Sequence, residues 1–224
     1  MAAAEAGLEQ EVRLPMEGAT LVGDLARPAR ARGVVLFAHG SGSSRHSPRN
    51  REVARVLRET GLATLLIDLL TRREEAEDAT TGHLRFDIGL LARRLSAVTD
   101  WLRGEGSTAR LPVGYFGAST GGGAALVAAA ERADVFAVVS RGGRPDLAGE
   151  ALGRVTAPTL LIVGGDDAAV IAMNRAAAAE MRAEVRLQIV PGASHLFEEP
   201  GALEQVAALA ARWFEDHLPP PARA

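Results

Sequence analysis

Short apolar runs, each the length of a β-strand, alternate along the chain with longer segments in which apolar residues recur every three or four positions. The first two runs, 12–14 and 20–25, flank Glu17-Gly18 and predict a β-hairpin that turns at those two residues. Further runs predict buried strands at residues 33–38, 63–68, 111–116, 136–140, 159–163 and 185–190. The helical periodicity predicts amphipathic helices at residues 51–59, 84–103, 120–132, 170–182 and 203–217.

Strands that are apolar almost throughout, separated by amphipathic helices, are typical of a parallel sheet with both faces covered. The pattern therefore predicts an α/β fold, a doubly wound and mostly parallel sheet with helices on both faces and no cap domain. No internal repeat or linker divides the chain, so we expect a single domain over residues 1–218 and a disordered C-terminal tail over 219–224. Ligands of such sheets bind beyond the carboxyl ends of the strands, so the residues that directly follow each strand are the candidates for a site.

The charge and the missing residue types exclude several classes of function. The 224 residues include 25 basic and 28 acidic side chains, and this balance argues against general nucleic-acid binding. The chain has no cysteine and no lysine, which excludes disulfides, cysteine nucleophiles and Schiff-base lysines. No apolar run approaches the ~18 residues of a membrane span, and the first ten residues lack a targeting pattern. We therefore expect a cytoplasmic monomer or homodimer that binds neither nucleic acid nor membranes.

The strongest candidate for a reactive group is Ser119, in the sequence Gly117-Ala118-Ser119-Thr120-Gly121. A predicted strand runs directly into this sequence, and an alanine-rich helix follows it. A serine at a sharp strand-to-helix turn has an exposed hydroxyl, and the turn needs small neighbours such as Gly117 and Gly121. The alternative is a phosphate-binding glycine loop, but the Gly-x-Gly-x-x-Gly spacing and a lysine are both missing. The pattern favours a serine nucleophile.

A serine nucleophile needs a base and a group that orients the base. His195 follows the last predicted strand, at the ligand end of the sheet, and is the candidate base. Asp166 and Asp167 follow the strand before it, so one is expected to orient His195 and the other to cap the next helix, while Asp68 is a weaker rival. Among the other histidines, His39 is expected to be a hydrogen-bonded structural residue, and His217 lies where a cation suits the end of a helix.

Small residues directly after the strand 33–38 form the fourth part of the predicted site. The sequence His39-Gly40-Ser41-Gly42 allows a loop to aim a backbone N–H at a developing oxyanion. We expect the N–H groups of Thr120 and Ser41 to form this oxyanion hole. The alternative for residues 39–42 is an ordinary glycine turn.

These segments together resemble the α/β-hydrolase superfamily, and within it a small, lidless member of the dienelactone hydrolase-like group that is found in bacteria. The resemblance rests on residues 36–42, 117–121, 161–170 and 190–200. The acid of that family usually stands in Gly-x-x-Asp-x-x-Val, which in this chain selects Asp167 over Asp166. The namesake enzymes use a cysteine nucleophile where this chain has Ser119. The resemblance therefore implies serine ester or lactone chemistry, with catalytic residues Ser119, Asp167 and His195 and no metal or cofactor.

Only about 16 residues separate Ser140 from Ala157, too few for a helical lid. We expect an open site, sealed at most by residues 70–82 and 141–145, that takes a small ester or lactone. The loops at the ligand end are rich in arginine, which binds carboxylates and phosphates, and the alternative is a solvated rim. Substrate contacts are expected from Gly40, Arg45 and Arg141. The rival functions are an acyltransferase or perhydrolase with the same triad, and a catalytically silent binding module.

Overall fold

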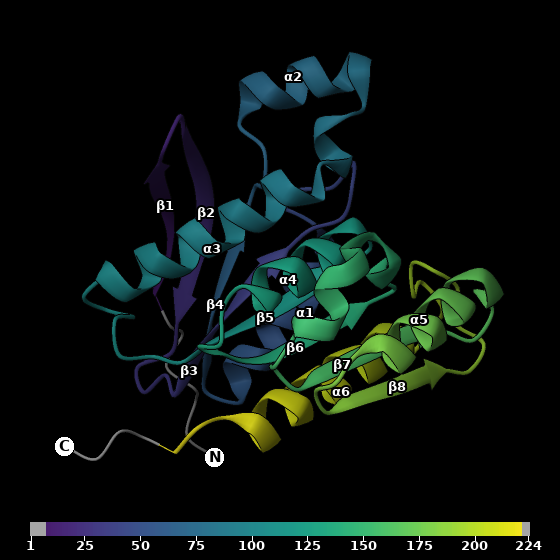
Figure 1. Ribbon diagram of the computed structural model, residues 1–224. Coiled ribbons are helices and arrows are strands. Elements are labelled where there is room, and N and C mark those ends of the chain that lie inside the picture. The colour runs from purple at the N-terminus through teal and green to yellow at the C-terminus, as the bar shows by residue number, and fades with distance from the viewer. Residues whose placement is uncertain (1–7, 221–224) are drawn as a thin grey trace.

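The computed structural model describes residues 8–220, which form an eight-stranded sheet with helices on both faces (Figure 1). The strand order is β1-β2-β4-β3-β5-β6-β7-β8. The pairs β1–β2 and β2–β4 are antiparallel, and all other neighbours are parallel. The strands are β1 (Leu8–Met16), β2 (Ala19–Arg27), β3 (Gly33–Ala38), β4 (Leu62–Ile67), β5 (Val113–Ala118), β6 (Val135–Arg141), β7 (Thr159–Gly164) and β8 (Val185–Val190).

The helices cover the two faces of the sheet because successive strand side chains point to opposite faces. On β3, Val35 and Phe37 pack with helices α1 and α6, whereas Val34 and Leu36 pack with α3 and α4 on the other face. The helices are α1 (Pro48–Glu59), α2 (Arg72–Thr81), α3 (Ile88–Gly104), α4 (Thr120–Ala130), α5 (Ala168–Glu180) and α6 (Ala202–His217), with short 3₁₀ segments η1 (Leu84–Phe86) and η2 (Pro145–Arg154). None of the helices described between residues 8 and 220 has the length and apolar character needed to cross a bilayer.

The order of the strands creates the crevice in which a ligand is expected. From β3 the chain passes to β4 on one side and then returns to β5 on the other side, so the strand order reverses between β3 and β5. Ala38 pairs with Gly117, which brings the carboxyl ends of these two strands level. The loops that follow β3 and β5 therefore face each other at the switch point, where open α/β sheets bind ligands.

The predicted hairpin, the doubly wound fold and every predicted strand are confirmed, with end shifts of a few residues. Three local predictions are wrong. The strand 185–190 is the sheet edge, and only Val190 is fully buried there. The segment 70–82, where no helix is predicted, contains α2, which extends beyond the body of the domain (Figure 1). The helix predicted from residue 84 begins only at Ile88, because the Asp87 side chain caps it by accepting the N–H of Leu90 (2.9 Å). Of the predicted tail, residues 221–224 lie outside the described residues.

Candidate active site

Ser119 lies at the sharp turn between β5 and α4, where the sequence predicts it. Its φ of 51° and ψ of −122° are rare for a residue with a side chain. Among residues 8–220, Phe197 is the only other non-glycine residue with a positive φ. The surrounding backbone holds the turn, since the N–H of Ser119 donates to the carbonyl of Arg141 (3.2 Å) and its carbonyl accepts from Gly122 (2.9 Å). A strained backbone conformation persists only where neighbouring contacts hold it in place, and strained residues of this kind are common at functional sites.

Glycine at position 121 allows α4 to start against the end of β3. A Cβ atom on Gly121 would lie 2.2 Å from the carbonyl oxygen of Ala38 and 2.6 Å from that of His39. Both neighbours are backbone atoms, so neither can move aside as a flexible side chain would. This close approach brings the first turn of α4, with its free N–H groups, next to the loop that follows β3.

His195 and Asp167 meet across the loops that follow β8 and β7. His195 Nδ1 lies 2.7 Å from Asp167 Oδ2. Because a carboxylate oxygen accepts the hydrogen bond, the proton of the neutral ring lies on Nδ1 and Nε2 is left as the basic nitrogen. The His195 side chain is 39% exposed, so its ring remains open to solvent and to a ligand.

Asp167 performs two tasks that the sequence analysis divided between two residues. Its Oδ2 binds His195, and its Oδ1 accepts the N–H of Val170 (3.3 Å), which caps α5. Asp166 is exposed and does not cap the helix, so the predicted division of roles is wrong. A carboxylate has several lone-pair sites, so one side chain can serve both partners. Asp68, the rival orienting residue, binds Arg45 instead.

Ser119 and His195 line the same cavity, which has a volume of about 240 Å³. Of the other predicted site residues, Gly40, Ser41 and Arg141 also line it. Arg45 does not, because its guanidinium is held by Glu11, Asp24 and Asp68. The structure thus brings together residues from the loops after β3, β5 and β8 and from the end of β6, and leaves Arg45 in an ion-pair cluster.

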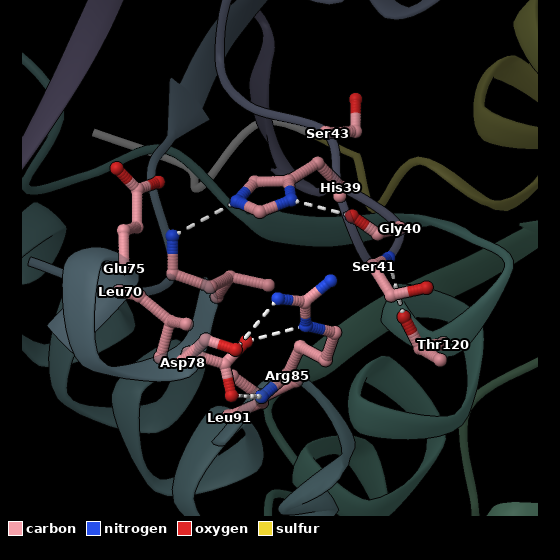
Figure 2. Close-up of a pocket in the computed structure, with 12 residues that line it drawn as sticks. His39, Gly40, Ser41, Ser43, Leu70, Glu75, Asp78, Arg85, Leu91 and Thr120 are labelled. Carbon is pink, nitrogen blue, oxygen red and sulfur yellow. Dashed lines mark hydrogen bonds and ion pairs between the residues drawn. The ribbon is translucent and has the colours of Figure 1, made fainter. Parts of the chain in front are cut away.

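The loop after β3 and the start of α4 contact each other directly. The N–H of Ser41 donates to the Thr120 hydroxyl oxygen (2.8 Å), as Figure 2 shows. Thr120 is the first residue of α4, where a backbone N–H has no partner within the helix. The two predicted oxyanion donors are therefore neighbours. The Ser41 N–H already donates to the Thr120 hydroxyl. A substrate oxyanion can therefore accept this hydrogen bond only if it displaces that hydroxyl.

His39 has a structural role, as predicted. Its Nε2 accepts the N–H of Leu69 (3.0 Å), so its proton lies on Nδ1, which donates to the carbonyl of Gly40 (2.8 Å). Burial lowers the pKa of His39, which keeps the ring neutral. The residue links the loop after β3 to the loop after β4 and stabilises the loop that carries Ser41 (Figure 2).

A second cavity of about 240 Å³ shares the 40–43 loop with the first (Figure 2). Leu69, Leu70 and Leu91 form its apolar lining, and Gly40, Ser41 and Ser43 line both cavities. The acidic residues that line this cavity, Glu75 and Asp78, both come from α2. Asp78 forms an ion pair with Arg85. Burial, together with the nearby charge of Asp68, raises the pKa of Glu75.

This second cavity was not predicted, because α2 has no apolar stripe that would mark it as a helix in the sequence. A detectable signal was present, since Thr71 and Glu74 have the Thr-x-x-Glu spacing of a capping box, and the structure contains both of its hydrogen bonds. Asn50, which lines the first cavity, had no such signal, because an asparagine near the start of a helix is common. Within residues 8–220, no group of three or more His, Cys, Asp or Glu side chains is arranged to hold a metal ion.

The switch-point crevice, the serine turn and the His–Asp pair define an α/β-hydrolase fold. The dienelactone hydrolase family model matches residues 19–218, and the chain belongs to that family. A solved dienelactone hydrolase from Anabaena variabilis is 62% identical, with a TM-score of 0.94 over 96% of this chain and 100% of that one. The esterase Est1E from Butyrivibrio proteoclasticus is 18% identical, with a TM-score of 0.76 over 92% of this chain and 98% of that one, and shares the fold.

Two curated proteins from Mycobacterium tuberculosis, one from strain CDC 1551 and one from strain H37Rv, are each 60% identical over 211 residues. Both carry a provisional name as phosphoribosyl transferases. The match covers 94% of this chain and 47% of each relative, so the chain spans about half the length of the curated relatives it matches. The family and its solved structures support a hydrolase.

Proposed function

We propose that the protein is a serine hydrolase that cleaves small esters or lactones through an acyl-enzyme on Ser119. The observation that carries the proposal is the 2.7 Å bond from His195 Nδ1 to Asp167, with His195 and the strained Ser119 on one cavity. In this tautomer Nε2 is free to take the serine proton, and the carboxylate stabilises the imidazolium that forms. The family match is consistent with this chemistry.

The reaction follows from these roles. Ser119 Oγ attacks the carbonyl carbon while His195 Nε2 accepts its proton, and the carbonyl oxygen becomes an oxyanion. The N–H groups of Thr120 and Ser41 stabilise that charge. His195 then protonates the leaving alkoxide, and the ester bond breaks to leave the acyl group on Ser119. Water, deprotonated by His195, attacks the acyl-enzyme, and the acid leaves as Ser119 regains its proton.

Labelling with a fluorophosphonate tests the proposal directly. The wild-type protein should gain the mass of one phosphonyl group, because an activated serine displaces fluoride from phosphorus. The Ser119→Ala protein should gain none, and intact-mass spectrometry with peptide mapping distinguishes the two results. A folded wild-type protein that gains no mass, or a label on another residue, would contradict the proposed nucleophile and favour a binding module.

The size of the two cavities predicts a preference for short acyl groups. Each cavity measures about 240 Å³, below the roughly 300–1,000 Å³ of pockets that bury a drug-sized ligand. A methylene group adds affinity only where it is buried, so an acyl chain longer than the cavity gains nothing. Across 4-nitrophenyl esters from acetate to dodecanoate, kcat/KM should be highest at chains of about six carbons or fewer. A preference for acyl chains longer than about ten carbons would contradict this prediction, because such chains need an extended apolar tunnel to bury them.

A further inference from the structure

The strand β8 leaves one edge of the sheet open. It is the last strand in the order, and among the described elements only β7 pairs with it. The carbonyls of Glu184 and Val190 accept N–H groups at the two ends of β7 (2.8 Å each), so the even-numbered residues of β8 bond to β7. The N–H and C=O groups of one strand residue point to the same side, and that side alternates along the strand. The backbone groups of Val185, Leu187 and Ile189 therefore point away from the sheet.

The opposite edge of the sheet, β1, is protected against pairing with another chain, and β8 is not. Natural edge strands are commonly protected by proline and by charged side chains. Strand β1 carries the exposed residues Glu9, Glu11, Arg13 and Pro15. Strand β8 has no proline, and Arg186 is its one charged residue. An edge of this composition is a template for pairing with a further strand.

The described part of the chain does not itself cover this edge. Residues 8–220 begin with β1, on the opposite edge of the sheet. After α6, the side chain of Leu218 packs against the central strand β3, where a Cβ on Gly33 would lie 2.8 Å from the Leu218 Cδ1 atom. Both ends of the described chain therefore lie away from β8, and none of its residues supplies the missing strand.

The sequence of β8 is complementary to a second copy of itself. With a two-fold axis at Leu187, an antiparallel pair places Leu187 against its own copy, Val185 against Ile189, and Arg186 against Gln188. The half-buried apolar side chains thus meet on one face of the sheet, and the two polar side chains meet on the other. In this register, residues 185, 187 and 189, whose backbone groups point outward, form the hydrogen-bonded pairs of the antiparallel ladder. One shift of the strand would satisfy both the backbone and the side chains.

The surface beside β8 carries both charge signs. Helices α5 and α6 contact β8 from opposite faces of the sheet (Figure 1). On the α6 face, a cavity of about 260 Å³ is lined by Arg186, Arg212 and Asp216 and by Trp213, whose ring centroid lies 5.2 Å from the Arg186 guanidinium carbon. The ion pairs within residues 8–220 include none of these three charged side chains. A patch with both signs can be complementary to itself across a two-fold axis, whereas a patch with one sign repels its copy.

We propose that two copies of this chain pair along β8, antiparallel about a two-fold axis at Leu187, and form one continuous sheet. This pairing uses both open edges, and the two edges that remain are copies of the protected strand β1. The association therefore closes at two chains. The paired strands run in opposite directions, so the carboxyl ends of the two sheets, each with its Ser119 cavity, lie at opposite ends of the dimer. The inference does not depend on the proposed hydrolase activity.

Size-exclusion chromatography with light scattering tests the association. The wild-type protein at about 100 μM should have twice the 23.4 kDa mass of one chain, since that concentration saturates an interface with a Kd of about 1 μM. Leu187→Lys places two ammonium groups opposite each other at the axis, so the Kd of the dimer should rise at least about 100-fold. Leu187 is half-buried, so the lysine can reach solvent in the single chain, and a thermal melt checks the fold. Gln10→Lys adds the same charge to the exposed face of β1 and should keep the dimer mass.

Single cysteines test the pairing itself, because the chain has no cysteine of its own. In the proposed register, Arg186 and Gln188 of the second copy form a non-hydrogen-bonded pair with Cα atoms about 4.5 Å apart, which a disulfide can span. Mixed Arg186→Cys and Gln188→Cys proteins should therefore form a disulfide-linked dimer that contains one of each. Arg186→Cys alone should form little, since its two copies are diagonal neighbours about 7–8 Å apart. Gln10→Cys, on β1, should form none.

Three results would overturn the proposal. The first is a wild-type mass of one chain at about 100 μM. The second is a dimer that persists in Leu187→Lys without a mixed disulfide, because the copies would then associate through another surface. The third applies if Leu187→Lys does not fold: the mixed disulfide then decides, and its absence counts against pairing along β8, whereas its formation only from the two proteins together supports it.

Discussion

Replacing Ser119 with alanine should lower kcat for a small ester by at least about 10⁴-fold. The acyl group has no other atom to bond to, and only the oxyanion donors and substrate binding remain to accelerate the reaction with water. Alanine keeps the Cβ atom at the strained turn, so we expect the fold to persist. Steady-state kinetics against a short-chain ester, together with a thermal melt, measure both effects.

Ser44→Ala is the matched control for this variant. Ser44 is in the loop after β3, where its hydroxyl accepts the N–H of His46 (3.2 Å), and it does not line the cavity of Ser119. Its kcat should stay within about twofold of the wild type, because the lost hydroxyl makes one local hydrogen bond and does not line the cavity of Ser119. Full activity in Ser119→Ala would show that another group attacks the substrate.

The second large effect is expected from Asp167→Asn. An amide presents its NH₂ group to His195 as readily as its oxygen, so the ring no longer has to hold its proton on Nδ1. The basic nitrogen then faces away from Ser119, and kcat should fall by about 10³- to 10⁴-fold. Asparagine is also a good N-cap, so α5 should keep its cap at Val170 and the protein its stability.

Asp166→Asn makes the same chemical change at the neighbouring position and serves as the control. Asp166 is exposed, and the hydrogen bond to His195 comes from Asp167 instead. Its kcat should remain near the wild-type value. Equal losses in the two variants would mean that a general negative charge after β7, and not the orientation of His195, accounts for the effect.

The elements of this protein were predictable wherever a local pattern decides the structure. Apolar runs of strand length predicted the central strands, because a strand buried on both faces accepts few polar residues. Gly117, Ser119 and Gly121 predicted the turn between β5 and α4, since the crowding of that turn depends on residues adjacent in sequence. Helix α2 escaped prediction because its stability does not come from an apolar stripe, and the capping box at Thr71 was its one clear local signal.

The candidate site was predictable as a set of positions and not as a set of contacts. The order of strands and loops placed Ser119, Asp167 and His195 at one end of a sheet, and the sequence by itself determined that much. Which of two adjacent aspartates reaches His195 depends on the direction of each side chain at the start of α5. That direction follows from the backbone conformation at the turn, which hydrogen bonds from other segments hold in place.

The arginines show most clearly what only the tertiary structure decided. In sequence, Arg45 and Arg141 are equivalent candidates, since each follows a strand at the ligand end of the sheet. The fold surrounds Arg45 with carboxylates from β1, β2 and the end of β4, and within residues 8–220 it leaves Arg141 without one. Ion pairing depends on distances between residues far apart in the chain, so no local pattern contains it. The sequence determined that cations gather at this end, and the packing of distant segments determined which of them forms no ion pair among residues 8–220.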